Sequence, residues 1–372
     1  MEIPAPRPRI ILCLDLDAFF ASVEIADNPR LDDPAHPLAV GSPDPRRGVI
    51  STASYAARVF GVKSGMSTAE ALRRCPALKV VVPRHDRYQQ VSDTIFDICR
   101  RVTPKVEPTS VDEGFLDATD LLARDQDPAV LAAELRRVIK AETGLTATIG
   151  IGAGKRIAKI ACDRAKPDGI LEIEAGAEAQ YLAPLPAGVI SGVGPKTAAI
   201  LLTNGIRTCA DLAATPPTHL IRWFGPKGNW MALAAAGIDD EPVEPNRARR
   251  TMSAELTLEE DVADPESLIA VAAGLADEIA RRLRGEGLFA RGLTLKLRDG
   301  DFKTITRAAG ISDGSDEAEL IAATAAALIT REARGKTYRL VGLAATHLAP
   351  GEQLTLFAAG EITPTPSAPA EA

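Results

Sequence analysis

A continuous apolar run near the N-terminus ends in a pair of acidic residues. The run from Ile10 to Leu16 predicts a buried strand of about five or six residues. Asp15 and Asp17 stand at its end, and residues i and i+2 of a strand share a face. Buried carboxylates repel each other and lose hydration unless a cation or hydrogen-bond donors satisfy them. Two interpretations of the acidic pair are therefore open: a cation site, or a simple N-cap of the helix expected at 18–26.

A second acidic pair, Asp112-Glu113, lies between apolar residues farther along the chain. In a regular strand these side chains would point to opposite faces, but Gly114 marks a place where the backbone can bend. Together with Asp15 they form an all-oxygen set, which is the ligand type that Mg²⁺ prefers. Such a set is typical of two-metal phosphoryl and nucleotidyl transfer. The alternative is a solvated acidic turn.

The order of elements around this pair predicts how the two acidic sites meet. Apolar spacing predicts a helix over 88–102, and periodicity of the same kind predicts helices over 128–143 and 155–165. With the strands at 10–16 and 146–152 and the acidic hairpin, the order is strand–helix–strand–strand–helix–strand. That is the split βαβ, or ferredoxin-like, arrangement, and it places the first strand beside the hairpin. His85, in a polar loop, is expected to have no role.

The stretch from Gly48 to Gly65 reads as a strand, a helix and a Gly-rich turn. Tyr55 and Arg58 are three residues apart and therefore share a helix face. A phenol beside a guanidinium suits phosphate oxygens, which arginine binds through a bidentate fork. An ordinary surface arginine is the alternative.

Residues 174–240 are expected to be mostly short helices. The Gly192-Val-Gly194 turn lies between two helical patterns and exposes backbone amides at a helix N-terminus, where a DNA phosphate can bind. A plain turn is the alternative.

The C-terminal part predicts a second α+β domain of about 100 residues after an extended basic stretch at 241–250. Strands are expected at 251–258, 288–297, 304–307 and 338–347, and helices at 265–284 and 317–331. Thr294, Lys296 and Arg298 share the outer face of one strand and could follow DNA phosphates. A solvated face is the bland alternative. The Pro/Ala/Thr-rich end from Gly360 predicts disorder.

Composition narrows the class of protein. The 372 residues suggest about two to four domains. The net charge of −7 argues only weakly against a nucleic-acid partner, because a groove needs just a local basic stripe. Five scattered cysteines without metal-ligand spacing suit the reducing cytoplasm. No apolar run is long enough to predict a membrane span.

Five motifs in register resemble those of the Y-family, or lesion-bypass, DNA polymerases. They are Asp15-Leu-Asp-Ala-Phe-Phe20, Ser54-Tyr-Ala-Ala-Arg-Val-Phe-Gly-Val62, Ser110-Val-Asp-Glu-Gly-Phe-Leu-Asp117, Ala158-Lys-Ile-Ala-Cys-Asp-Arg-Ala-Lys-Pro-Asp-Gly169 and Gly192-Val-Gly194. The resemblance covers about residues 9 to 348. Gly114, Ala56 and Gly154 depart from the family pattern without removing a charged ligand.

The resemblance implies an α+β multidomain fold: a right-hand polymerase with a ferredoxin-like palm. The implied domains are palm (1–18 and 84–173), small fingers (19–83), helical thumb with helix-hairpin-helix (174–240), basic linker (241–250), α+β little finger (251–348) and flexible tail (349–372). The implied activity is translesion synthesis, in which dNTPs are added to a primer on template DNA. The expected protein is a cytoplasmic monomer.

The resemblance also assigns site residues. Asp15, Asp112 and Glu113, with the Leu16 carbonyl, match the ligands of two Mg²⁺ ions, and Glu113 matches the catalytic acid residue. Asp17 matches a position that is usually not a ligand. The implied dNTP contacts are Phe19, Phe20, Thr52, Tyr55, Arg58 and Lys166, with Phe20 as the steric gate against a ribose 2′-hydroxyl. The expected DNA contacts are Gly192, Gly194, Lys196, Lys296 and Arg298.

The segment Gln353-Leu354-Thr355-Leu356-Phe357 follows the last expected strand. Exposed apolar residues on a flexible segment usually mark a partner site. The pattern resembles the peptide by which bacterial polymerases dock on the sliding clamp, through Gln353, Leu354, Leu356 and Phe357. Folding back of the segment onto the preceding domain is the alternative.

Two functions other than polymerisation are also compatible with the motifs. They are a nucleotidyl cyclase with a palm-like fold and a non-catalytic DNA-binding accessory protein.

Overall fold

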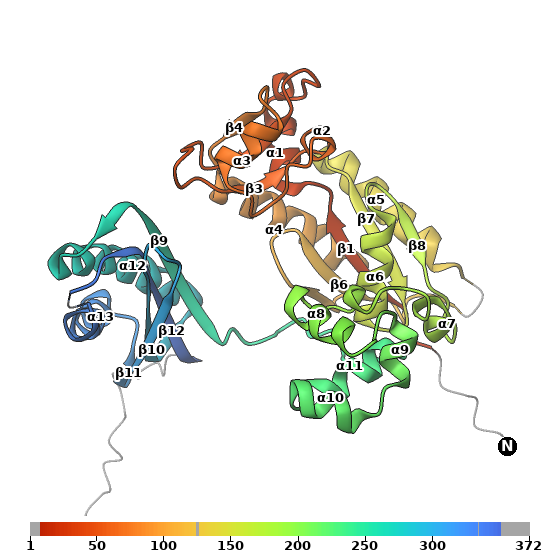
Figure 1. The fold of residues 1–372 in the computed structure, drawn as a ribbon. Coiled ribbons are helices and arrows are strands. Elements are labelled where there is room, and N and C mark those ends of the chain that lie inside the picture. Colours follow the sequence, from red (N-terminus) through yellow and green to blue (C-terminus); the bar gives the residue numbers. More distant parts are fainter. Residues whose placement is uncertain (1–7, 124–125, 334, 351–372) are drawn as a thin grey trace, which may run out of the picture. The chain divides into compact units, whose positions relative to one another are not determined.

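The computed structural model describes residues 8–123, 126–333 and 335–350, and the chain divides into two compact units, 1–247 and 248–372 (Figure 1). The clamp peptide and the expected tail from residue 351 onward lie outside the described residues, whereas the first two tail residues, 349 and 350, end the last strand. Among the residues that are described, no helix is both long and apolar enough to cross a bilayer.

The first unit is built on a five-stranded sheet with strand β1 at its centre. The strand order is β5-β6-β1-β7-β8, and β1 pairs antiparallel with both neighbours. This arrangement confirms the expected position of the first strand beside the acidic hairpin. The strands are β1 (Ile11–Leu16), β5 (Val106–Pro108), β6 (Glu113–Asp117), β7 (Ala147–Gly152) and β8 (Ile170–Glu172).

Successive side chains of β1 point to opposite faces of the sheet, as strand geometry requires. Leu12, Leu14 and Leu16 belong to the core on the face covered by helices α4 (His85–Val102) and α5 (Pro128–Thr143). Ile11 and Cys13 face helix α6 (Lys155–Ala165) and form a smaller cluster with its Ala158 and Cys162. The same alternation directs Asp15 toward α6. The expected helix at 88–102 in fact begins three residues earlier, at His85.

Helix α6 lies directly against the sheet because residue 150 of β7 is a glycine. A Cβ atom placed on Gly150 would lie 2.0 Å from the Ala158 carbonyl oxygen and 2.1 Å from the Cys162 amide nitrogen. Both atoms belong to the α6 backbone, which cannot move aside as a flexible side chain could. Gly150 therefore sets the distance between α6 and the strands that carry the acidic residues.

Residues 19–83 add a small three-stranded sheet in the order β3-β2-β4. Ser54 and Ser67 accept hydrogen bonds from backbone amides of the helices that follow them, as N-cap residues do. The elements are α1 (Phe19–Asp27), η1 (Pro29–Leu31), β2 (Leu38–Gly41), β3 (Ile50–Ala53), α2 (Tyr55–Val59), α3 (Thr68–Arg74) and β4 (Lys79–Val81).

Short helices that follow β8 pack around Ile157 and Ile160 of α6 to form a third core. The expected helix before Gly192 is only the single 3₁₀ turn η2, and α8 begins directly after Gly194. The helices are α7 (Glu178–Leu182), η2 (Ala187–Val189), α8 (Pro195–Thr203), α9 (Cys209–Ala214), α10 (Pro217–Phe224) and α11 (Lys227–Ala235).

The stretch predicted as a linker, 241–250, is attached to the first unit over most of its length. Glu107 on β5, only 2% exposed, accepts hydrogen bonds from the Lys155 ammonium at 2.7 Å and from the Glu244 amide at 2.8 Å. Arg247 reaches the same carboxylate at 3.5 Å. The division between the units falls after Arg247.

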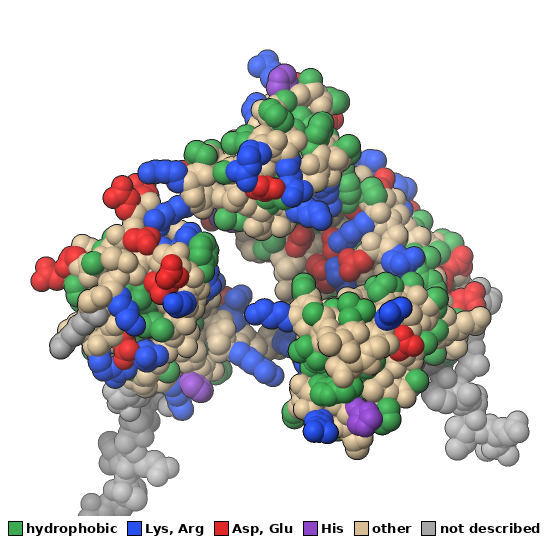
Figure 2. Space-filling view, viewed as in Figure 1, with side chains coloured by type: hydrophobic (Ala, Val, Ile, Leu, Met, Phe, Trp, Pro, Cys, Tyr) green, Lys and Arg blue, Asp and Glu red, His purple; other side chains and the backbone are tan. Residues whose placement is uncertain are grey.

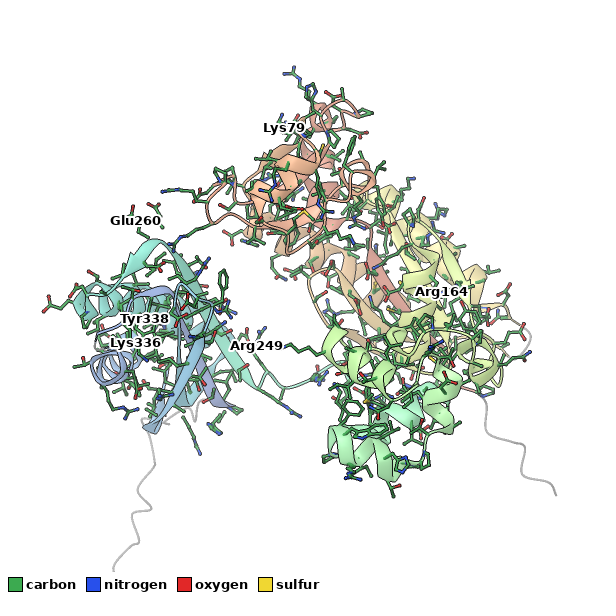
Figure 3. All side chains as sticks on the ribbon, viewed as in Figure 1. Lys79, Arg164, Arg249, Glu260, Lys336 and Tyr338 are labelled. Carbon is green, nitrogen blue, oxygen red and sulfur yellow. The ribbon has the colours of Figure 1, made fainter. Side chains whose placement is uncertain are left out.

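The second unit is a four-stranded antiparallel sheet in the order β11-β10-β12-β9, with two helices packed on one face. Tyr338 begins β12 and its ring is buried in this core (Figure 3). Strand β11 runs far beyond the expected end at residue 307. The small residues that follow show no alternation of polar and apolar side chains, so the sequence pattern does not reveal this part of the strand. The elements are β9 (Thr251–Val262), α12 (Pro265–Glu286), β10 (Leu288–Arg298), β11 (Thr304–Ser315), α13 (Ala318–Glu332) and β12 (Tyr338–Pro350).

The contact at Gly150 gives a test of how α6 packs on the sheet. We expect Gly150→Ala to destabilise the first unit by about 3 kcal/mol, because the new methyl group overlaps backbone atoms of α6. Urea unfolding followed by circular dichroism measures the change. Gly188→Ala is the matched control, since a Cβ there meets no atom within 4 Å. Equal stability of the two variants would show that α6 tolerates displacement.

Candidate active site

Pairing of β1 with β6 brings the two acidic sites together. Asp15 lies opposite Glu113 in the strand register. The Lys159 ammonium of α6 lies 2.9 Å from Asp15 Oδ2 and 2.5 Å from Glu113 Oε2. In Figure 2, acidic and basic side chains gather in a hollow of the first unit. The two carboxylates therefore converge on a single positive atom.

Asp163 on α6 and Lys166, directly after that helix, complete the cluster formed by Asp15, Glu113 and Lys159. The Lys166 ammonium is 2.5 Å from Asp15 Oδ2, on the same oxygen that Lys159 contacts. Asp163 lies between the two lysines in sequence, 3.1 Å from one ammonium and 3.3 Å from the other. Sequence reasoning assigned Lys166 but missed Lys159 and Asp163. The available signal was their spacing of four and three residues, which places them on one helix face.

Asp112 has a different local environment. Its carboxylate accepts a hydrogen bond from the Ser110 hydroxyl at 2.6 Å, and its carbonyl accepts one from the Leu16 amide at 2.9 Å. Within the part of the chain that the structure describes, no three His, Cys, Asp or Glu side chains are grouped closely enough to enclose a metal ion. Asp15 and Glu113 nevertheless fit a cation, because their oxygens already converge on the ammonium of Lys159.

Burial and charge shift the pKa values of this cluster. Burial raises the pKa of Glu113, and the hydrogen bond from Lys159 opposes that effect only in part. For Lys159, burial alone would lower the pKa, but attraction to Asp15 and Glu113 outweighs it and the pKa lies above its usual value. The ammonium therefore stays protonated at neutral pH.

Asp17 neither caps α1 nor joins Asp15 in the ion-pair cluster. The N-cap of α1 is Ala18, which makes no side-chain capping bond. The Asp17 carboxylate, 3% exposed, accepts hydrogen bonds from Thr148 Oγ1 at 2.9 Å, the Asp168 amide at 3.0 Å and the Tyr55 hydroxyl at 3.3 Å. Three donors satisfy its charge without a metal ion. It connects Tyr55 to the turn that follows Lys166.

Tyr55 and Arg58 lie together, as their spacing predicts. The Arg58 guanidinium stacks 4.5 Å from the centre of the Tyr55 ring, and its Nε donates to the Ala53 carbonyl at 3.0 Å. Burial, followed by the nearby Asp17 carboxylate, raises the pKa of the Tyr55 hydroxyl. Thr52 is half-buried on β3 just before these residues.

The two adjacent phenylalanines have different surroundings. Phe20 is half-buried, and its ring stacks on that of Tyr88 at 4.1 Å with an interplanar angle of 16°. His85, expected in a polar loop, is instead the first residue of α4 and meets the Phe20 ring edge-on at 5.8 Å. Phe19 is only 2% exposed and packs in the core, so its side chain is not available for a nucleotide contact.

The expected DNA contacts of the first unit surround the start of α8. Gly192 has a φ of +92°, and its carbonyl accepts a hydrogen bond from Lys227 at 2.7 Å. Gly194 is the N-cap of α8, and Lys196 is exposed on its first turn. The turn therefore has free space at Gly194, and Lys196 and Lys227 lie close to it.

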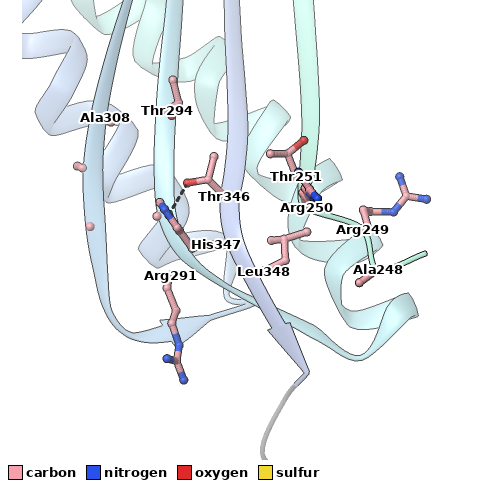
Figure 4. A pocket seen from close by; sticks show the side chains of 13 residues that line it. Ala248, Arg249, Arg250, Thr251, Arg291, Thr294, Ala308, Thr346, His347 and Leu348 are labelled. Carbon is pink, nitrogen blue, oxygen red and sulfur yellow. Dashed lines mark hydrogen bonds between the residues drawn. The ribbon is translucent and has the colours of Figure 1, made fainter. Parts of the chain in front are cut away.

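The second unit carries a basic groove of ≈ 760 Å³ on the face of the sheet opposite its helices (Figure 4). Polar and basic residues along it include Arg249, Arg250, Arg291, Thr294, Thr346 and His347. The expected contacts Lys296 and Arg298 follow Thr294 on β10. Lys296 is paired with Glu255 at 2.6 Å and Arg298 donates to Thr304 at 2.8 Å.

Comparisons with known proteins agree with this architecture. Residues 14–163 match the impB/mucB/samB family and residues 249–356 match the C-terminal domain of the same family. A solved Y-family DNA polymerase chimera of Dbh and Dpo4 superposes with a TM-score of 0.84 and 26% identity, covering 92% of this chain and all of that one. The fold class is that of a right-hand Y-family polymerase.

Full-length relatives define the family more closely. A DNA polymerase IV of Alkalilimnicola ehrlichii is 38% identical over 94% of this chain and 99% of its own length. A DNA polymerase IV of Streptomyces coelicolor is 39% identical over 94% of this chain and 73% of its own. The chain therefore belongs to the impB/mucB/samB family of Y-family polymerases, which are DNA-directed DNA polymerases of translesion synthesis.

The position of Phe20 gives a test of sugar selection. We expect Phe20→Ala to keep dNTP incorporation and to admit ribonucleotides, since deletion of the ring opens space without removing a charged group. Single-nucleotide incorporation with dNTP and rNTP in parallel measures the ratio. Phe302→Ala removes an exposed ring from the second unit and serves as the control. Unchanged discrimination in an active Phe20→Ala enzyme would exclude the steric-gate role.

Proposed function

We propose that this chain transfers nucleotidyl groups from dNTPs to a primer 3′-hydroxyl with two Mg²⁺ ions held by Asp15, Asp112, Glu113 and the Leu16 carbonyl. The observation that supports this most strongly is the convergence of Asp15 and Glu113 on one ammonium nitrogen. Asp112 adjoins this pair through the bond between its carbonyl and the Leu16 amide. When bound, the ions would lower the pKa of the attacking hydroxyl and neutralise the leaving pyrophosphate.

The neighbouring residues have the chemistry needed to hold a triphosphate. Lys166, Tyr55 and Arg58 would donate to phosphate oxygens, with the Arg58 guanidinium offering a planar fork. Asp17 supports this assignment, because one carboxylate fixes both the Tyr55 hydroxyl and the backbone turn after Lys166. Thr52 and the main chain at Phe19 and Phe20 complete the proposed nucleotide pocket.

DNA would be held through its phosphates and therefore without base specificity. In the first unit the proposed contacts are Gly192, Gly194 and Lys196 at the start of α8. In the second unit they are Lys296 and Arg298, together with the arginines of the groove. The Lys296–Glu255 pair is exposed, so exchange of its partner for a phosphate costs little.

The other functions fit the observations less well. A nucleotidyl cyclase needs no duplex grip, yet the chain retains the family's C-terminal domain. A non-catalytic accessory protein would have lost carboxylates, whereas all three are present. Action in the cytoplasm as a monomer is part of the proposal. The cytoplasm is supported by the five cysteines, which are all free and buried.

Primer extension on a defined template tests the catalytic assignment. We expect Mg²⁺-dependent extension by the wild type and a loss of at least about 100-fold for Asp112→Ala, since the variant lacks one ligand of the ions that stabilise the transition-state charge. Asp120→Ala, an exposed carboxylate on the same unit, is the control. Extension without Mg²⁺, or full activity of Asp112→Ala, would refute the assignment.

A second experiment addresses the proposed sliding-clamp partner. We expect deletion of 353–357 to leave extension of a short linear primer intact and to abolish stimulation by clamp loaded on circular DNA, because the tether raises the local enzyme concentration. Calorimetry with isolated clamp measures the affinity directly. Equal clamp affinity with and without the pentapeptide would disprove this partner site.

A further inference from the structure

The ammonium of Lys159 lies on the same carboxylate oxygens that the proposed metal site requires. Its distances to Asp15 Oδ2 and Glu113 Oε2 are 2.9 and 2.5 Å. Mg²⁺ binds carboxylate oxygens at about 2.0–2.1 Å and demands near-octahedral geometry. One oxygen pair cannot hold the ammonium and a metal ion at the same point, so the two cations compete.

A second partner for Lys159 is already in place. Asp163 lies one helical turn away on α6, with its Oδ1 3.1 Å from the ammonium. Its side chain is 52% exposed, against 10% for Asp15 and 23% for Glu113. Lys159 can therefore keep one ion pair by rotation of its own side chain, without movement of the α6 backbone that Gly150 fixes against the sheet.

We propose that Lys159 is an internal counter-cation that neutralises Asp15 and Glu113 until metal binds, and that Asp163 is the group that receives it afterwards. Lys159 and Asp163 are thus positioning residues for the metal site, and this role rests on the proposed function. It explains why two partly buried carboxylates can stand side by side without severe repulsion. It also means that the charge of Lys159 opposes metal binding.

A purely electrostatic influence of both residues is the competing explanation. In that case Lys159 would weaken metal binding and Asp163 would strengthen it independently, so their effects would add. In the exchange that we propose, Asp163 acts through Lys159. Most of its effect should then disappear once Lys159 is removed, leaving only the part that its 3.3 Å pair with Lys166 carries, and a double-mutant cycle separates the two explanations.

The experiment measures Mn²⁺ binding to the complete chain, without DNA or dNTP, by the electron paramagnetic resonance signal of free Mn²⁺. We expect Lys159→Met to bind at least about tenfold more tightly, because a unit charge a few ångströms away is removed. Lys159→Arg should bind as weakly as wild type. Asp163→Asn should bind several-fold more weakly alone, and the double variant should bind nearly as tightly as Lys159→Met.

Arg164→Met is the matched control, since it removes one exposed positive charge from the same helix (Figure 3). Thermal unfolding of each variant in the presence of a chelator tests whether the metal-free protein is folded. Additive effects of Lys159→Met and Asp163→Asn, or no change in either, would overturn the exchange while leaving the proposed function intact. Mn²⁺ binding that Asp15→Asn does not weaken would overturn both.

Discussion

The site depends on one register in the central sheet. Antiparallel pairing of β1 with β6 sets Asp15 opposite Glu113, although the two residues are far apart in the sequence. Because strand side chains alternate, a shift of one residue would turn Asp15 into the leucine-rich core on the other face. The buried Leu12, Leu14 and Leu16 prevent that shift. Hydrophobic packing on one face thus fixes the carboxylates on the other.

The register alone would leave two acidic groups in a partly buried place, which is unfavourable unless positive charge lies near. Helix α6 supplies that charge, and its distance from the sheet follows from the absent side chain at Gly150. A helix displaced by even the width of a methyl group would carry Lys159 away from the two carboxylates. Close backbone packing and charge neutralisation are therefore parts of one arrangement.

Patterns local to one element were predictable from the sequence, and contacts between elements were not. The apolar run of β1 and the order of the elements gave the ferredoxin-like arrangement and brought the acidic motifs together, and the spacing of Tyr55 and Arg58 placed them on one helix face. The right-hand polymerase fold came from the resemblance of the motifs to a known family. The partners of Asp17 come from three separate segments, so no spacing rule indicates them. The prediction ended strand β11 too early because Ala308, Ala309 and Gly310 show no alternation of polar and apolar side chains. The buried pair of Lys155 and Glu107 had no local signal at all.

The net charge of this protein is a poor guide to how it binds DNA. Many of the carboxylates lie in ion pairs, as at Asp15, Glu107 and Asp27, where the paired charges contribute little field at a distance. The open sheet face of the second unit is made mostly of small and hydroxyl side chains, with arginines along its groove. Such a surface lets a phosphate chain approach the backbone closely and meet positive charge locally. A chain of net charge −7 can thus present basic surfaces, but its net charge does not attract DNA at long range, which leaves affinity for DNA dependent on close contacts.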